Sequence, residues 1–141
     1  RSGESLRPLL LKATSGLLAI GLLPFGIVAL LGPMLFGVVF GSDWIPAGEY
    51  ARWMTVWVLF EFANVPSVQA TAILGLQRGF LIWTVLFLGA RVGALAAGSV
   101  LLSSAVGTVA CFAIASACMN CVLIGWVFMR SGSSRRPVRE D

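Results

Sequence analysis

Two opposite charges lie inside apolar stretches of this sequence, where a charge is costly and usually has a role. Glu61 belongs to the stretch 53–77 and Arg91 to the stretch 79–102. At 1.5 Å per residue, they lie about 12 Å and about 16 Å from the ends expected to share one side of a membrane. A charge near a bilayer centre costs at least ~2.5–3.5 kcal/mol. Their similar depth on adjacent helices predicts a Glu61–Arg91 ion pair.

Two interpretations of this pair are open. In the first, the ions neutralise each other and serve only the structure. In the second, Glu61 or Arg91 faces a hydrated cavity and binds an anionic substrate group or takes part in proton coupling. Asn64 and Gln69 can share a broad helical face with Glu61. The candidate substrate-binding or coupling residues are therefore Glu61, Arg91, Asn64 and Gln69.

Catalytic and metal-binding patterns are missing from the sequence. It contains no histidine, which removes the commonest general base and metal ligand. Cys118 and Cys121 form a C-x-x-C spacing, but they lie within an apolar stretch that has no carboxylate. We interpret the cysteines as small apolar side chains and expect no metal site. No phosphate-binding loop, nucleophile elbow or carboxylate pair is found, so we expect no enzyme.

The elements that carry these residues are predicted to be transmembrane helices. The chain is 58% hydrophobic and 11% charged, whereas soluble domains are about 25% charged. The segment from Ala13 to Ser42 has no charge and exceeds the roughly 20 residues that cross a bilayer. We predict an all-α integral membrane protein with a turn at Ser103–Ser104. Its four spans are about 13–40, 53–77, 79–102 and 104–129.

The basic residues predict the orientation. With four spans, most of them fall on one side, which should be the cytoplasm. These residues are Arg1, Arg7, Lys12, Arg78, Arg130, Arg135, Arg136 and Arg139. The net charge of +4 thus marks membrane topology and not nucleic-acid binding. We predict a cytoplasmic segment 1–12, a transmembrane region 13–129 and a disordered basic cytoplasmic tail 130–141, with both termini cytoplasmic.

Aromatic residues, prolines and glycines add local expectations. Trp44, Tyr50, Trp53 and Trp57 should anchor the outer interface, and the loop 41–52 should form an interfacial helix before the second span. Prolines within the spans predict helix kinks. Gly89 and Gly93 form a GxxxG spacing that lets helices approach closely within the chain. The full sets are Pro24, Pro33 and Pro66 for kinks, and Gly89, Gly93 and Gly98 for helix packing.

Two motifs resemble a known family. The stretch Phe36 to Tyr50 reads FGVVFGSDWIPAGEY, and Pro66–Ser67 is followed by LGLQR at Leu74 to Arg78. Over about 8–130, the chain resembles bacterial polysaccharide flippases, the O-antigen and exopolysaccharide translocases of the multidrug/oligosaccharidyl-lipid/polysaccharide exporter superfamily. The motifs are loose and mostly apolar.

The resemblance implies the C-terminal third of such a transporter, within a larger helical bundle in the bacterial inner membrane. The missing N-terminal transmembrane helices of the same transporter would be its partners, along with membrane lipids. The implied activity is alternating-access transport of an undecaprenyl-pyrophosphate-linked oligosaccharide, coupled to a cation such as H⁺ or Na⁺. The first residue, Arg1, also suggests a fragment.

Two alternatives stay open. A small four-helix multidrug exporter would fit the length and would use one buried glutamate, although its glutamate lies in the first span. A structural subunit of a membrane complex would use Glu61, Arg91 and the GxxxG spacing only for association. An encoding reading frame that continues upstream through further apolar spans would favour the flippase.

Overall fold

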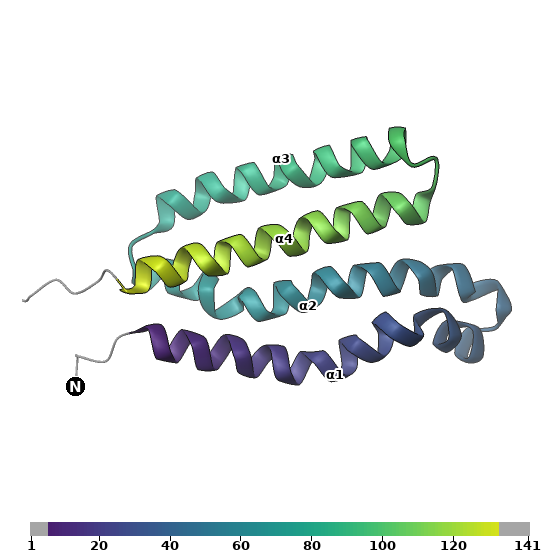
Figure 1. Ribbon diagram of the computed structural model, residues 1–141, viewed down its shortest axis with the longest axis horizontal. Coiled ribbons are helices and arrows are strands. Elements are labelled where there is room, and N and C mark those ends of the chain that lie inside the picture. Colours follow the sequence, from purple (N-terminus) through teal and green to yellow (C-terminus); the bar gives the residue numbers. More distant parts are fainter. Residues whose placement is uncertain (1–5, 133–141) are drawn as a thin grey trace, which may run out of the picture.

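The structure is a computed structural model that describes residues 6–132, and these form four long helices (Figure 1). Each of the four is long and apolar enough to cross a membrane. This confirms the predicted all-helical class with four spans. The elements in chain order are α1 (Leu6–Phe40), the short 3-10 helix η1 (Ser42–Trp44), α2 (Ile45–Ile73), α3 (Gln77–Leu101) and α4 (Ala105–Gly132).

Several predicted boundaries need correction. Helix α1 begins at Leu6, so part of the predicted segment 1–12 is helical. Helix α2 begins at Ile45, so most of the loop 41–52 is helical and leads directly into the predicted second span. Pro46 occupies the first turn of α2, where its missing N–H has no helical partner to lose. The first residues of the predicted tail 130–141 belong to α4, and its remainder, 133–141, lies outside the described residues.

Two tight turns return the chain between helices. Gly75 has a positive φ of 67°, and the N–H groups of Gly75 and Leu76 donate to the carbonyls of Ala72 and Thr71. This Schellman arrangement ends α2 and explains the glycine in LGLQR. At the second turn, the Ser104 hydroxyl accepts the N–H of Gly107 and caps α4. The predicted turn at Ser103–Ser104 is therefore confirmed.

The helices lie in a single layer in the order α1, α2, α4, α3 (Figure 1). The start of α1 and the end of α4 lie at the same end of this layer. Helices α2 and α4 are the inner pair and contain most of the buried positions. Many of these are small or polar, including Ala63, Ser67, Ala113, Ser116 and Ala117. Small residues let helix backbones approach closely where lipid provides no hydrophobic driving force.

Glycines mark the closest helix contacts, but not where the GxxxG spacing predicts them. A Cβ atom added at Gly48 would lie 2.6 Å from the carbonyl oxygen of Gly32, so α1 and α2 touch backbone to backbone. A Cβ atom at Gly98 would lie 3.0 Å from the Cα of Thr108 on α4, as expected for a packing residue. At Gly89 and Gly93, an added Cβ would meet no atom within 4 Å. These two glycines therefore do not pack against another described helix, because α3 turns this face outward.

The prolines do not interrupt their helices. Helix α1 continues through Pro24 and Pro33 and bends in its second half (Figure 1), and α2 continues through Pro66. Pro33 has no N–H to donate to the carbonyl of Ala29, four residues earlier. Nε of Arg52, on α2, donates to this oxygen at 2.8 Å. Arg52 of α2 thus donates the hydrogen bond that Pro33 of α1 cannot donate.

We expect the Arg52→Met substitution to lower the free energy of unfolding by about 1.5–3 kcal/mol, the range for a hydrogen bond to a charged group. In a Pro33→Ala background the helix regains its own N–H donor, so the same substitution should cost less than about 1 kcal/mol. Reversible unfolding in mixed SDS micelles, followed by far-UV circular dichroism, would measure both values. Equal costs in the two backgrounds would show that Arg52 does not act through the Ala29 carbonyl.

Candidate functional site

A polar cluster forms where α2, α3 and α4 meet, and it is centred on Glu61. Three donors reach the same carboxylate oxygen, Oε2, of this side chain. They are Nε1 of Trp57 at 2.8 Å, Nη2 of Arg91 at 3.0 Å and Nδ2 of Asn120 at 3.2 Å. The predicted Glu61–Arg91 ion pair is thus confirmed as a contact, and it connects α2 with α3. Because only Oε2 is used, the other oxygen, Oε1, has no hydrogen-bond partner among residues 6–132.

The guanidinium of Arg91 is held between aromatic rings. Its carbon lies 4.0 Å from the ring centroid of Phe87, 4.8 Å from that of Trp57 and 5.8 Å from that of Phe112. Its Nε donates to the hydroxyl of Ser116 at 3.2 Å. Ring faces attract a cation and orient it without neutralising its charge. Arg91 therefore keeps a full positive charge in a defined position.

Two buried amides extend the cluster between α2 and α4. Nδ2 of Asn64 donates to Oδ1 of Asn120 at 2.7 Å, and Nδ2 of Asn120 also donates to the Ser116 carbonyl at 3.1 Å. Asn64 and Asn120 are only 3% and 1% exposed. Oδ1 of Asn64 is buried without a donor among the described residues. Together with Oε1 of Glu61, the cluster thus has two acceptor atoms without a donor among residues 6–132.

The charged end of the cluster is open to the outside of the helix layer. The side chains of Glu61 and Arg91 are 50% and 23% exposed. A half-exposed carboxylate within a transmembrane helix faces a water-filled cavity or polar protein in preference to lipid chains. The arrangement can therefore accept a cation or a donor at the free oxygen of Glu61. It can equally present Arg91 to an anion, provided that the anion replaces the carboxylate.

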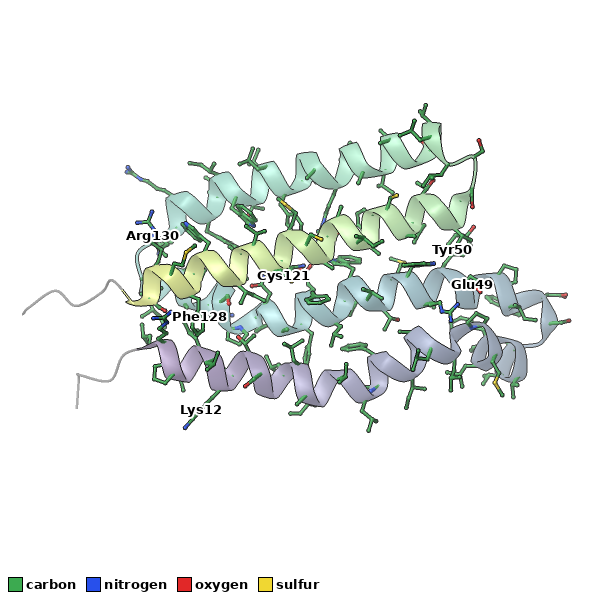
Figure 2. All side chains as sticks on the ribbon, viewed as in Figure 1. Lys12, Glu49, Tyr50, Cys121, Phe128 and Arg130 are labelled. Atoms are coloured by element: carbon green, nitrogen blue, oxygen red, sulfur yellow. The ribbon has the colours of Figure 1, made fainter. Side chains whose placement is uncertain are left out.

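The other predicted residues lie outside the cluster or have a second contact within it. Gln69 is exposed and does not join the cluster. It follows Glu61 by eight residues and Asn64 by five, so around the helix axis it points about 80° away from Glu61 and about 140° away from Asn64. Trp57 was expected at the outer interface, but its N–H binds Glu61. Trp44 is 53% exposed at the start of α2. Tyr50 and Glu49 lie toward the end of the layer opposite Arg130 (Figure 2).

Sequence reasoning missed the contribution of α4 to this site. Asn120 and Ser116 lie one turn apart and provide contacts to Glu61 and Arg91. A signal was present, because Asn120 is an amide within an otherwise apolar span and polar groups in such spans are usually paired. The aromatic partners of Arg91 carry no comparable signal, since phenylalanine is common on lipid-facing surfaces.

Comparison with known proteins leaves the chain without an assigned family. No family model, curated protein or solved structure matches it. Its four apolar helices are consistent with a multi-pass membrane protein.

Proposed function

We propose that this chain is the C-terminal part of a flippase for lipid-linked oligosaccharides in the bacterial inner membrane. The Glu61–Arg91 cluster lines its translocation pathway. The observation that carries this proposal is the half-exposed carboxylate of Glu61 within a helix long enough to span a membrane. A group of this kind favours contact with water or a polar solute, and a transport pathway provides both.

The open architecture supports a role within a larger helical bundle. Four helices in one layer leave both broad faces uncovered, and Gly98 is the one residue of α3 that is buried among the described residues. The missing N-terminal transmembrane helices of the transporter would cover one face. Basic residues gather at the shared end of α1 and α4, including Arg7, Lys12 and Arg130. The positive-inside rule places that end, and both termini, in the cytoplasm.

The chemistry of the cluster suits an anionic lipid-diphosphate substrate. Arginine recognises phosphate oxygens through its planar set of donors, and Arg91 is already oriented by the surrounding rings. When a substrate phosphate binds Arg91, the Glu61 carboxylate loses its counter-ion. A coupling cation, H⁺ or Na⁺, then compensates the charge of Glu61. Alternating access follows if the Glu61–Arg91 ion pair forms when the pathway opens to one side of the membrane and breaks when it opens to the other.

The proposal is tested in a bacterium that produces the protein, with Glu61→Gln and Arg91→Ala introduced separately and together. Each single change should reduce surface polysaccharide about tenfold or more, because a hydrogen bond to a charged group contributes about 1.5–3 kcal/mol. Lipid-linked oligosaccharide should accumulate in the inner membrane, and the double variant should not recover export. Surface glycan, the lipid-linked intermediate and the amount of protein in the membrane are measured together.

Glu49→Gln is the matched control, because Glu49 forms an exposed ion pair with Arg52, 3.7 Å away, outside the cluster. This variant should export normally. Recovery of export in the Glu61→Gln/Arg91→Ala double variant, which carries neither charge, would assign the pair a structural role and favour a structural subunit. Normal glycan export with lost resistance to cationic drugs would favour a small multidrug exporter.

A further inference from the structure

An apolar groove lies between α3 and α4, next to the end of the layer where α3 begins and α4 ends. Its volume is about 490 Å³. Each wall is one face of a helix, with lining residues at positions i, i+3, i+4 and i+7. These run from Gly79 to Leu86 on α3 and from Val122 to Met129 on α4. The indole rings of Trp83 and Trp126 belong to these walls. The groove is separate from the Glu61 cluster.

Helix α3 contacts α4 closely near both of its ends. Near the Ser103–Ser104 turn, Gly98 lets α3 approach the backbone of Thr108 closely. Near the opposite end, the ring of Trp126 fills the space beside Gly79, where an added Cβ would lie 3.0 Å from the ring. Gly125 has no atom within 4 Å of an added Cβ. The lack of a side chain at this position leaves the groove open.

Positive charge flanks the open groove. Arg78 directly precedes the lining residue Gly79, and Arg130 directly follows Met129. The guanidinium carbon of Arg130 lies 6.0 Å from the centroid of the Trp126 ring, so this arginine lies beside the groove wall. Figure 2 shows Arg130 at this end of the layer. The carboxylates of residues 6–132 belong to η1 and α2, and none of them pairs with either arginine.

We propose that this groove binds an anionic phospholipid of the membrane, with one acyl chain between α3 and α4 and its phosphate at Arg78 and Arg130. An occupant must be apolar along the groove and negative where the helices leave the bilayer, and an anionic phospholipid has both properties. A packed apolar helix would cover the walls but would bring no anion to the arginines, which have no carboxylate partner among residues 6–132. The bound lipid is a resident component and is distinct from a transported substrate.

The test measures tryptophan fluorescence of the chain in phosphatidylcholine vesicles that contain a minor fraction of lipid with brominated acyl chains, which quench nearby indoles. Brominated phosphatidylglycerol should quench more strongly than brominated phosphatidylcholine, because its headgroup is drawn to the arginines. Each basic residue near a membrane surface contributes about 1 kcal/mol, so Arg78→Gln and Arg130→Gln should each lower this preference about fivefold. Gly125→Leu adds a side chain to the groove at a position where an added Cβ meets no atom within 4 Å, and it should abolish the preference.

Two variants serve as matched controls. Gly93→Leu adds the same side chain to an open position of α3 outside the groove, and Lys12→Gln removes a positive charge from α1. Both should quench like the unmodified chain. Equal quenching by the two brominated lipids would overturn the proposal, as would a preference that survives Gly125→Leu.

If the Gly125→Leu variant loses its helical circular dichroism, the Arg78→Gln/Arg130→Gln double variant tests the proposal instead. Both arginines are exposed, so their replacement should leave the fold intact. A preference that survives in this double variant would overturn the proposal. Displacement of the quencher by undecaprenyl phosphate, but not by excess unbrominated phosphatidylglycerol, would assign the groove to a polyprenyl carrier and would also overturn it.

Discussion

Replacing Arg91 with alanine is expected to lower the free energy of unfolding by about 3 kcal/mol, the cost of an uncompensated charge in the middle of a transmembrane helix. The change removes the counter-ion that lies 3.0 Å from the Glu61 carboxylate. It also empties the site between the rings of Phe87 and Trp57. Reversible unfolding in mixed SDS micelles, followed by far-UV circular dichroism, measures the loss.

The compensating change at Glu61 separates the charge effect from the packing effect. Glu61→Gln in the Arg91→Ala background removes the stranded charge, so the double variant should recover most of the lost stability. A double-mutant cycle would then give a coupling energy of about 2 kcal/mol, within the range for contacting residues. Strictly additive losses would show that Glu61 and Arg91 do not stabilise each other. The same cycle in the export assay reports on function independently of stability.

Gly48→Ala is expected to destabilise the contact between α1 and α2 by about 3 kcal/mol, the upper part of the usual range for overpacking. An added Cβ would lie 2.6 Å from both the Gly32 carbonyl oxygen and the Pro33 Cα. Both are backbone atoms, so no side-chain rotation relieves the clash, and the helices have to move apart. The hydrogen bond from Arg52 to Ala29 crosses the same contact and should weaken with it. Unfolding midpoints in SDS titrations would measure the effect.

Gly16→Ala provides the matched control on α1. An added Cβ at Gly16 meets no atom within 4 Å, so alanine should stabilise the helix by about 0.5–1 kcal/mol through its better helix propensity. If Gly48→Ala were as well tolerated as Gly16→Ala, the close approach of α1 and α2 would be wrong.

Much of the helical architecture could be predicted because hydropathy is a local property. The run from Ala13 to Ser42 without a charge, and the similar depths of Glu61 and Arg91, required no knowledge of neighbouring helices. The ends of α1 and α2 were harder to place. Helices extend beyond the apolar core, and charged residues such as Arg7 and Glu49 occur near their starts. Hydropathy therefore predicts the membrane-embedded part of a helix better than its ends.

The composition of the site could be predicted only in part. Depth along the chain placed Glu61 near Arg91, and that contact is present. The rotation of each helix about its axis was not accessible, so Gln69 was grouped with Glu61 although it is exposed elsewhere on α2. For the same reason the GxxxG spacing of Gly89 and Gly93 suggested a packing face. The close contact instead involves Gly32 and Gly48, which belong to different helices.

The amino-acid sequence alone is sufficient to predict four helices long and apolar enough to span a membrane, and the contact between Glu61 and Arg91. Backbone groups in lipid must bond within their own helix, so each span is recognised from its own residues. The lateral order α1, α2, α4, α3, the donation from Trp57 and Asn120 to Glu61, and the groove beside Trp126 came only from the folded chain. These features depend on which helix faces meet. Small residues far apart in the sequence determine which faces meet, because they allow close contact between the helix backbones.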